Sequence, residues 1–224
     1  LTLNPPLTNK NNHSLKREII FIQDISGSMS GEPIKQSKIG LEMAIKRLKP
    51  NDKFNIVLFN DHYSSYARTP VLATAKERDK AIRYVRRLSA ENGTDMYPAL
   101  SFSLNNFRSN KSVLKQLIFL TDGAVTEETK LFSLINSKLK TSRLFTIGIG
   151  SAPNSFFMTR AAEIGRGSHI HIGDMSEISV RMEELFNKIE NPAITDLELL
   201  LPKGFKAEVY PNPLPDLYVG DPLS

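Results

Sequence analysis

Continuous apolar segments alternate with amphipathic helical segments along most of this chain, and this alternation limits the folds that it can adopt. Residues 18–22 form an apolar strand of the type that is buried on both faces of a parallel sheet. The apolar residues Ile34, Leu41 and Ile45 follow at helical spacing, and Pro33 suits the first turn of that helix. The same succession of strand and helix continues as far as residue 189.

This succession predicts an α/β fold: a Rossmann-like three-layer sandwich with a central, mostly parallel sheet, one short antiparallel strand and helices on both faces. Right-handed crossovers place the carboxyl ends of the parallel strands along one edge, where α/β proteins bind ligands. The expected strands are residues 18–22, 54–59, 65–68 (the antiparallel one), 113–120, 144–149 and 168–172. The expected helices are residues 33–48, 82–88, 94–107, 127–139, 156–164 and 178–189.

Composition divides the chain into three segments. Residues 1–16 are polar and rich in Pro and Asn, which predicts a linker, and residues 17–190 hold the α/β pattern and are expected to fold alone. Residues 191–224 are expected to be a C-terminal β extension that is part of a truncated further domain, with strands at 195–201 and 205–210. Because two strands are not stable alone, we expect this extension to pack on the α/β segment or to stay extended, adding little to its core.

Composition also excludes several kinds of chemistry. The chain has no cysteine, so disulfides, thiolate metal sites, iron–sulfur clusters and cysteine nucleophiles are ruled out. No apolar run approaches the roughly 20 residues of a membrane span. The net charge is +5, but the Lys and Arg residues are scattered over helical patterns, without the basic and aromatic strip that binds single-stranded nucleic acid. We therefore expect no nucleic-acid partner and no direct membrane insertion.

Side chains that carry oxygen follow the first predicted strand. Asp24, Ser26 and Ser28 alternate directly after it, so that three side chains can turn to one side of a tight loop. Gly27 relieves steric restriction within that loop. The loop lies at the strand end where open α/β sheets bind ligands.

Two further segments supply oxygen atoms near the same edge. Thr121 and Asp122, followed by Gly123, close the strand at 113–120, and Thr94 stands just before a helix. Each segment alone has an ordinary structural interpretation, as a helix cap or as a common turn. Their occurrence together favours a site for a hard cation, because Mg²⁺ prefers oxygen ligands. The predicted metal residues are Asp24, Ser26, Ser28, Thr94 and Asp122, with Mg²⁺ as the expected ion and Mn²⁺ or Ca²⁺ as the other candidates.

The three segments resemble those of a known family. FIQDISGSM, NGTDMYPAL and FLTDGAV are similar to the three parts of the metal-ion-dependent adhesion site in von Willebrand factor A-type domains. The resemblance covers about residues 17–190. It is greatest for the A domains of inter-α-trypsin inhibitor heavy chains and of related bacterial exported proteins, including marine proteobacterial sortase targets. The flanking segments LTLNPP, FNDHYSSY and YPNPLPDLYVGDPL are also similar to that subgroup.

The resemblance implies an adhesion-type, protein-binding module of an exported multidomain protein, located outside the cell, at the cell surface or in the periplasm. It implies that Ser26, Ser28 and Thr94 ligate the ion directly or nearly so. Asp24 and Asp122 would act directly or through water. A Glu or Asp of a protein or extracellular-matrix ligand would fill the open position. One departure from the family is Gln23, where an apolar residue is usual; it flanks Asp24 and could hydrogen-bond near the site.

Other interpretations of these residues are weaker. A metal-assisted hydrolase could use Asp24 and Asp122, but hydroxyl ligands and the missing Lys or Arg phosphate clamp fit it poorly. A structural stalk with a vestigial site is a further alternative, against which the complete set of five residues argues. His169 and His171 alternate without an evident third ligand, which favours an edge strand over a zinc site. We therefore expect no enzyme, no catalytic residues and no organic cofactor.

Overall fold

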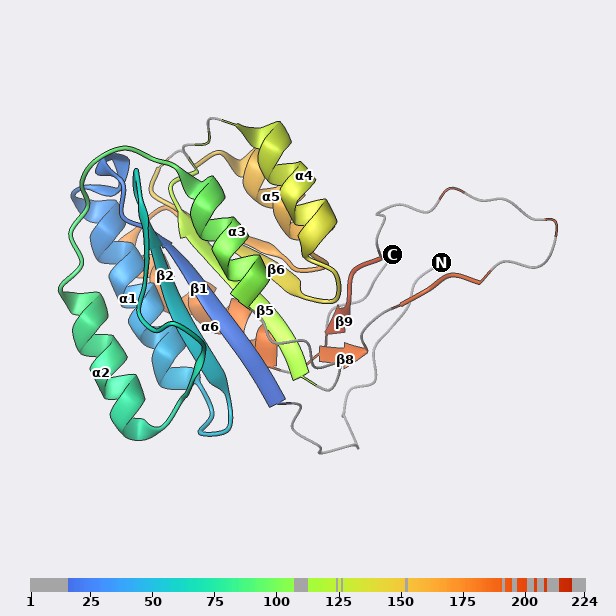
Figure 1. Cartoon of the computed structure of the whole chain (residues 1–224), viewed down its shortest axis with the longest axis horizontal. Helices are drawn as coiled ribbons and strands as arrows, with labels where there is room; N and C mark the ends of the chain where they lie inside the picture. The colour runs from blue at the N-terminus through green and yellow to red at the C-terminus, as the bar shows by residue number, and fades with distance from the viewer. Residues whose placement is uncertain are drawn as a thin grey trace.

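A central sheet with helices on both faces forms the body of the computed structural model (Figure 1). The structure describes residues 16–106, 113–123, 125, 127–151, 153–190, 192–194, 197–200, 204, 208 and 214–218. The strands of the sheet are β1 (Lys16–Asp24), β2 (Lys53–Phe59), β3 (Tyr63–Ser65), β4 (Val71–Leu72), β5 (Val113–Thr121), β6 (Arg143–Ile149) and β7 (His169–Ile172). Within the described residues the sheet is seven-stranded, in the order β3-β2-β1-β5-β6-β7 with β4 also paired to β2.

The prediction of a mostly parallel sheet is confirmed. Strands β2, β1, β5, β6 and β7 pair in parallel, and the antiparallel pairing is confined to β2. That pairing involves two short strands, β3 and β4, instead of one at residues 65–68. The chain returns to β2 early because a tight turn follows it, in which the Asn60 side chain accepts from the His62 N–H at 3.0 Å.

Six helices in the described residues cover the two faces of the sheet. Helices α1 (Glu32–Arg47), α2 (Ala75–Arg86) and α6 (Ile178–Glu190) pack on one face, and α3 (Met96–Asn106), α4 (Glu128–Lys138) and α5 (Ser155–Ile164) on the other (Figure 1). Strand β1 supplies both cores because its side chains alternate: Ile19 and Phe21 face the first group, and Ile20 and Ile22 the second. All four are buried, as expected for a central parallel strand.

Helix α2 begins earlier than the sequence analysis predicts. The apolar pattern placed a helix at residues 82–88, whereas α2 begins at Ala75 and ends at Arg86. Its first half is highly charged and mostly exposed, so apolar periodicity gives no sign of a helix there. The start is fixed instead by a cap, in which the Thr74 hydroxyl accepts from the Glu77 N–H at 3.2 Å.

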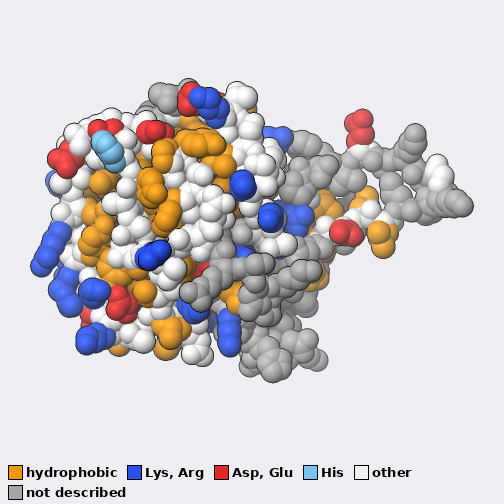
Figure 2. Space-filling model, viewed as in Figure 1, with side chains coloured by type: hydrophobic (Ala, Val, Ile, Leu, Met, Phe, Trp, Pro, Cys, Tyr) orange, Lys and Arg blue, Asp and Glu red, His pale blue; other side chains and the backbone are white. Residues whose placement is uncertain are grey.

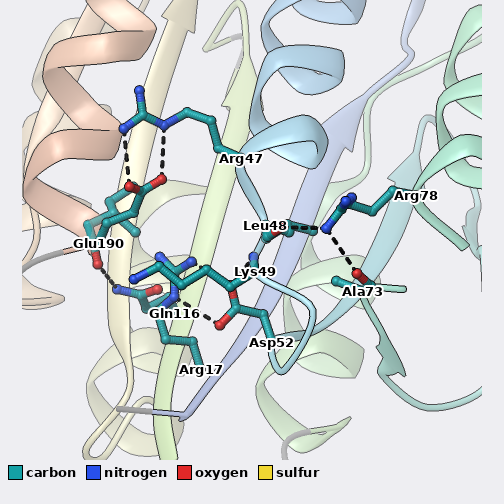
Figure 3. A network of polar contacts seen from close by, with 10 residues as sticks. Arg17, Arg47, Leu48, Lys49, Asp52, Ala73, Arg78, Gln116 and Glu190 are labelled. Atoms are coloured by element: carbon teal, nitrogen blue, oxygen red, sulfur yellow. Dashed lines mark hydrogen bonds and ion pairs between the residues drawn. The ribbon is translucent and has the colours of Figure 1, made fainter. Parts of the chain in front are cut away.

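Ion pairs fasten the end of the sheet at which the parallel strands begin (Figure 3). The Arg17 guanidinium, on β1, donates two hydrogen bonds to the Asp52 carboxylate just before β2, and both side chains are buried. Arg47, at the end of α1, binds the Glu190 carboxylate at the end of α6, with its Nε 2.9 Å from Oε1 and its Nη2 3.1 Å from Oε2. These contacts hold β1, β2, α1 and α6 together at this end.

The surface carries charges of both signs. On the face shown in Figure 2, Lys and Arg side chains stand at several separate places, with Asp and Glu among them. Within the part of the chain that the structure describes, no helix has both the length and the apolar character that a membrane span requires.

The C-terminal segment forms a second, two-stranded sheet and reaches the main body. Strand β8 (Pro192–Ile194) pairs in antiparallel with β9 (Leu217–Tyr218). Asp216, next to β9, accepts from Arg143 at the start of β6, with Oδ2 2.6 Å from Nε and Oδ1 2.8 Å from Nη2. The two side chains are only 2% and 1% exposed, so this segment completes a buried ion pair of the main body.

The strands expected at residues 195–201 and 205–210 are not found in the described residues. Residues 197–200 are not in a strand, and most of 205–210 lies outside the described residues. The side chains of Leu199 and Leu200 are 47% and 86% exposed, so these two residues gain none of the burial that favours a strand. The domain boundary after residue 190 stays a prediction.

Loss of the buried ion pair at the C-terminal segment should destabilise the fold. We expect Asp216→Ala to lower the free energy of unfolding by about 3–5 kcal/mol, because it removes a carboxylate that forms two hydrogen bonds with the buried Arg143 guanidinium. The matched control is Glu184→Ala, which breaks an exposed ion pair with Arg181 and should cost at most about 1 kcal/mol. Urea unfolding followed by circular dichroism gives both values. Equal, small losses would mean that residues 17–190 do not depend on this segment.

Candidate metal centre

The candidate site is built where β1 ends and the chain turns away from the sheet. Asp24 is the last residue of β1 and is fully buried. A short 3₁₀ turn (Gly27–Met29) follows and leads into α1. The loops after β2 and β5 and the loop before α3 meet this turn at the edge formed by the carboxyl ends of the parallel strands.

Both carboxylate oxygens of Asp24 accept hydrogen bonds. Oδ1 lies 2.8 Å from the backbone N of Ser26, and Oδ2 lies 2.5 Å from Oγ1 of Thr121 at the end of β5. Thr121 Oγ1 in turn accepts from the N–H of Gly123 at 2.9 Å. A chain of hydrogen bonds therefore joins the ends of β1 and β5 through the carboxylate of Asp24.

The two serines of the first segment lie together. Ser26 Oγ and Ser28 Oγ are 3.1 Å apart, with one hydroxyl donating to the other. Ser26 is fully buried, whereas Ser28 is exposed at the surface of the loop. The pair thus extends from the buried Asp24 toward solvent.

Thr94 is brought to this edge by its own loop. The Gly27 N–H donates to the Asn92 carbonyl at 2.9 Å, and the Asp95 N–H donates to the Asn60 carbonyl at 2.6 Å. The half-buried Thr94 lies between these two anchors. A Cβ atom at position 27 would lie 3.1 Å from the Asn92 carbonyl oxygen, so glycine permits this close approach of the two loops.

Asp122 acts on Asp24 electrostatically. Burial raises the pKa of Asp24, the hydrogen bonds from Thr121 and Ser26 oppose that rise, and the negative charge of Asp122 adds to it. The pKa of Asp24 is raised on balance. A cation held between the two carboxylates would offset both the cost of burial and the repulsion.

Thr121 is a site residue that the predicted set of metal residues does not include. Its hydroxyl orients Asp24 from the neighbouring strand. In the sequence, the feature that could have indicated this role of Thr121 is its position beside Asp122 at a strand end. The neighbouring Gly123 has φ of +78°, and a Cβ there would lie 2.5 Å from the Asn154 backbone N, so the start of α5 adjoins the site closely.

The atoms of this site that could ligate an ion are oxygen atoms, which suit a hard cation. Direct hydrogen bonds join Asp24, Ser26 and Ser28, and Thr94 is positioned by the contacts of its loop. Asp122 lies close enough to Asp24 for its charge to raise the pKa of Asp24. Among the described residues there is no group of three or more His, Cys, Asp or Glu that could hold a metal ion. A metal centre here would therefore depend on hydroxyl ligands as well as on two carboxylates.

The alternating histidines have structural contacts. Thr146 Oγ1 donates to the Met158 carbonyl at 2.9 Å, so at 3.0 Å it accepts from Nδ1 of His169. Burial lowers the pKa of His169. His171 Nε2 donates to the Gly150 carbonyl at 2.6 Å. Both rings thus secure the edge strand β7 to its surroundings.

A model of the von Willebrand factor type A domain matches residues 17–169. The chain belongs to the von Willebrand factor type A domain family. Domains of this family are commonly adhesion or protein-interaction modules, are generally non-enzymatic and often bind divalent metal ions.

Curated relatives and solved structures agree with this assignment. A von Willebrand factor A domain-containing protein of Dictyostelium discoideum is 30% identical over 185 residues, covering 82% of this chain and 20% of the relative. Inter-alpha-trypsin inhibitor heavy chain 4 of Mus musculus is 27% identical over 208 residues, covering 88% of this chain and 22% of that protein. The chain spans about a fifth of the length of these relatives. A von Willebrand factor type A structure from Catenulispora acidiphila has the same fold, with a TM-score of 0.72 at 24% identity over 80% of this chain and 44% of that one.

The hydrogen bond between Thr121 and Asp24 should contribute measurably to stability. We expect Thr121→Val to lower the free energy of unfolding by about 1.5–3 kcal/mol, because it removes a donor to a buried charged group. The control is Ser103→Ala, which removes a buried hydroxyl that donates to the neutral Ala99 carbonyl at 2.7 Å and should cost about 0.5–1.5 kcal/mol. Urea unfolding in EDTA measures both. A loss for Thr121→Val no larger than the control's would contradict an ionised Asp24 as its acceptor.

Proposed function

We propose that this chain is a metal-ion-dependent, adhesion-type protein-binding module. Its metal residues are Asp24, Ser26, Ser28, Thr94 and Asp122, and its ion is Mg²⁺, with Mn²⁺ or Ca²⁺ as the other candidates. The bound ion would supply an open coordination position for a carboxylate of a protein or extracellular-matrix ligand. By its resemblance to exported proteins, we place the module outside the cell, at the cell surface or in the periplasm. We propose no catalytic role.

The observation that carries this proposal is the way in which buried carboxylates are neutralised. Asp52 and Asp216 are buried, and each faces an Arg guanidinium. Asp24 is buried at least as deeply, but its hydrogen-bond donors are a neutral N–H and a neutral hydroxyl. A buried charge is stable only when it is paired or coordinates a metal. A divalent cation at this edge supplies the missing positive charge.

The hydroxyl ligands leave the ion reactive toward an outside anion. Ser26, Ser28 and Thr94 are neutral, so only Asp24 and Asp122 offset the charge of the ion. Ser28 is exposed, which places one ligand at the solvent boundary. An acidic side chain of a partner can approach from that side and complete the coordination shell.

Features around the site suit a protein partner. Tyr97 on the first turn of α3 is 40% exposed, and Phe156 on the first turn of α5 is 70% exposed. Aromatic side chains are enriched in protein interfaces. An open groove of about 610 Å³ lies between α3 and α4 and begins at Asp95, next to Thr94. Because it is open, this groove fits an extended protein surface better than an enclosed small molecule.

Metal titration tests the ligand set. We expect isothermal titration calorimetry to show one Mg²⁺ per chain, and Asp122→Asn to weaken its affinity by about 10–100-fold. The control is Asp61→Asn, because Asp61 is an exposed carboxylate of the same edge, with its Cβ 3.6 Å from where a Cβ of residue 93 would lie. Asp61→Asn should leave the affinity unchanged. Equal affinities for wild type and Asp122→Asn would show that the ion binds elsewhere.

Partner binding should depend both on the ion and on the exposed aromatic side chains of Tyr97 and Phe156. The probe is a panel of immobilised extracellular-matrix proteins, tested in Mg²⁺ and in EDTA by surface plasmon resonance. We expect binding that is lost in EDTA and weakened by Phe156→Ser, with Mg²⁺ affinity unchanged in that variant. Leu72→Ser is the control, since Leu72 is 50% exposed on β4 and pairs with Lys53 at the opposite end of β2. Binding that is equal in Mg²⁺ and EDTA would refute the adhesion function.

A further inference from the structure

A glutamine lies fully buried within an apolar face of the central strand. Gln23 alternates with Ile19 and Phe21 on the face of β1 that α1 and α6 cover. In the register of the sheet it stands between Leu58 of β2 and Leu120 of β5, which are both buried and apolar. A polar side chain in such surroundings is retained at a cost in stability.

The two ends of this side chain differ in their hydrogen bonding. Nε2 donates to the backbone carbonyl of Asp24 at 2.6 Å. Oε1 is buried without a hydrogen-bond partner in the described structure. An apolar residue would avoid the unpaired oxygen, so the contribution of Gln23 rests on what its amide donor does.

The Gln23 amide donor helps to fix the orientation of one peptide unit. The unit between Asp24 and Ile25 has one carbonyl and one N–H; the carbonyl accepts from Gln23, and the N–H donates to the Phe59 carbonyl at 2.9 Å. With both polar groups bound, the peptide plane cannot rotate freely. This plane sets the direction in which the Asp24 side chain leaves the backbone and in which the chain continues to Ser26.

We propose that Gln23 is a positioning residue for the loop of residues 24–28, called the metal loop below. It fixes the peptide that follows Asp24, and thereby holds Asp24 and Ser26 in the geometry that binds the ion. The effect on the ion rests on the proposed function. The effect on the loop does not, because it concerns hydrogen bonds that are formed without any ion. Groups that orient metal ligands from outside the coordination shell typically change metal affinity by about 10–100-fold.

The chain contains a matched comparator. Gln116 is buried on β5, pairs in register with Ile19 and so shares the face of Gln23. Its Nε2 donates to the Ile189 carbonyl at 2.9 Å, and its Oε1 is likewise buried without a hydrogen-bond partner among the described residues. It lies near the end of the sheet opposite to the candidate metal centre. The two glutamines therefore differ mainly in whether the carbonyl they bind belongs to the metal loop.

The experiment compares Gln23→Met with Gln116→Met, since Met keeps the length of the side chain but removes both the donor and the unpaired oxygen. Amide hydrogen exchange in EDTA, followed by NMR, reports on the loop without any metal. We expect Gln23→Met to speed exchange at Ile25 and Ser26 by at least about tenfold, with global stability equal to or above that of wild type. Gln116→Met should leave exchange at both amides unchanged.

Calorimetric titration with Mg²⁺ gives the second readout. We expect Gln23→Met to raise the Kd by about tenfold or more and Gln116→Met to leave it unchanged. Unchanged exchange at Ile25 and Ser26 in Gln23→Met overturns the positioning role, and so does an unchanged Kd. If wild type binds no Mg²⁺, the metal proposal fails, while the exchange result still decides whether Gln23 positions the loop. Gln23→Leu is the second variant if Gln23→Met does not fold.

Discussion

The burial of the Asp24 carboxylate at the end of the central strand is the constraint on which the arrangement of this edge depends. A carboxylate without access to water needs donors from the protein, and each donor here comes from a different part of the chain. The Ser26 N–H comes from the loop that follows, and the Thr121 hydroxyl comes from the end of β5. The hydrogen bonds that the Asp24 carboxylate requires thus bring together segments that are far apart in sequence.

The two ends of the sheet solve the problem of buried charge differently. At the end where the strands begin, Arg17 pairs with Asp52 (Figure 3) and Arg143 pairs with Asp216, so both of these buried acids have a base supplied by the protein. At the opposite end Asp24 receives only neutral donors. At the first end, the protein itself supplies the opposite charges for Asp52 and Asp216, and these ion pairs hold the elements together. The second is electrostatically incomplete, which is a property expected of a binding edge.

The fold could be predicted from the sequence because buried parallel strands contain continuous apolar runs, such as residues 19–22 and 117–120. Features that depend on individual polar contacts could not. The start of α2 is set by the cap at Thr74, and the role of Thr121 requires knowledge that β1 and β5 are neighbours. The predicted metal residues follow the motifs of the family, and the structure places their segments at one edge. Their ligand roles stay a prediction.

The positions of the start of β1 and of the Asp216–Arg143 ion pair have a mechanical consequence. Among the described residues β1 begins at Lys16, and Asp216 fastens the C-terminal segment to the first residue of β6. Both attachments lie at the same end of the sheet, because β1, β5 and β6 run parallel. A tensile load applied at these two points would therefore pass through the strand starts and the buried ion pair. The loops around Asp24 lie at the far end of the sheet, outside that load path.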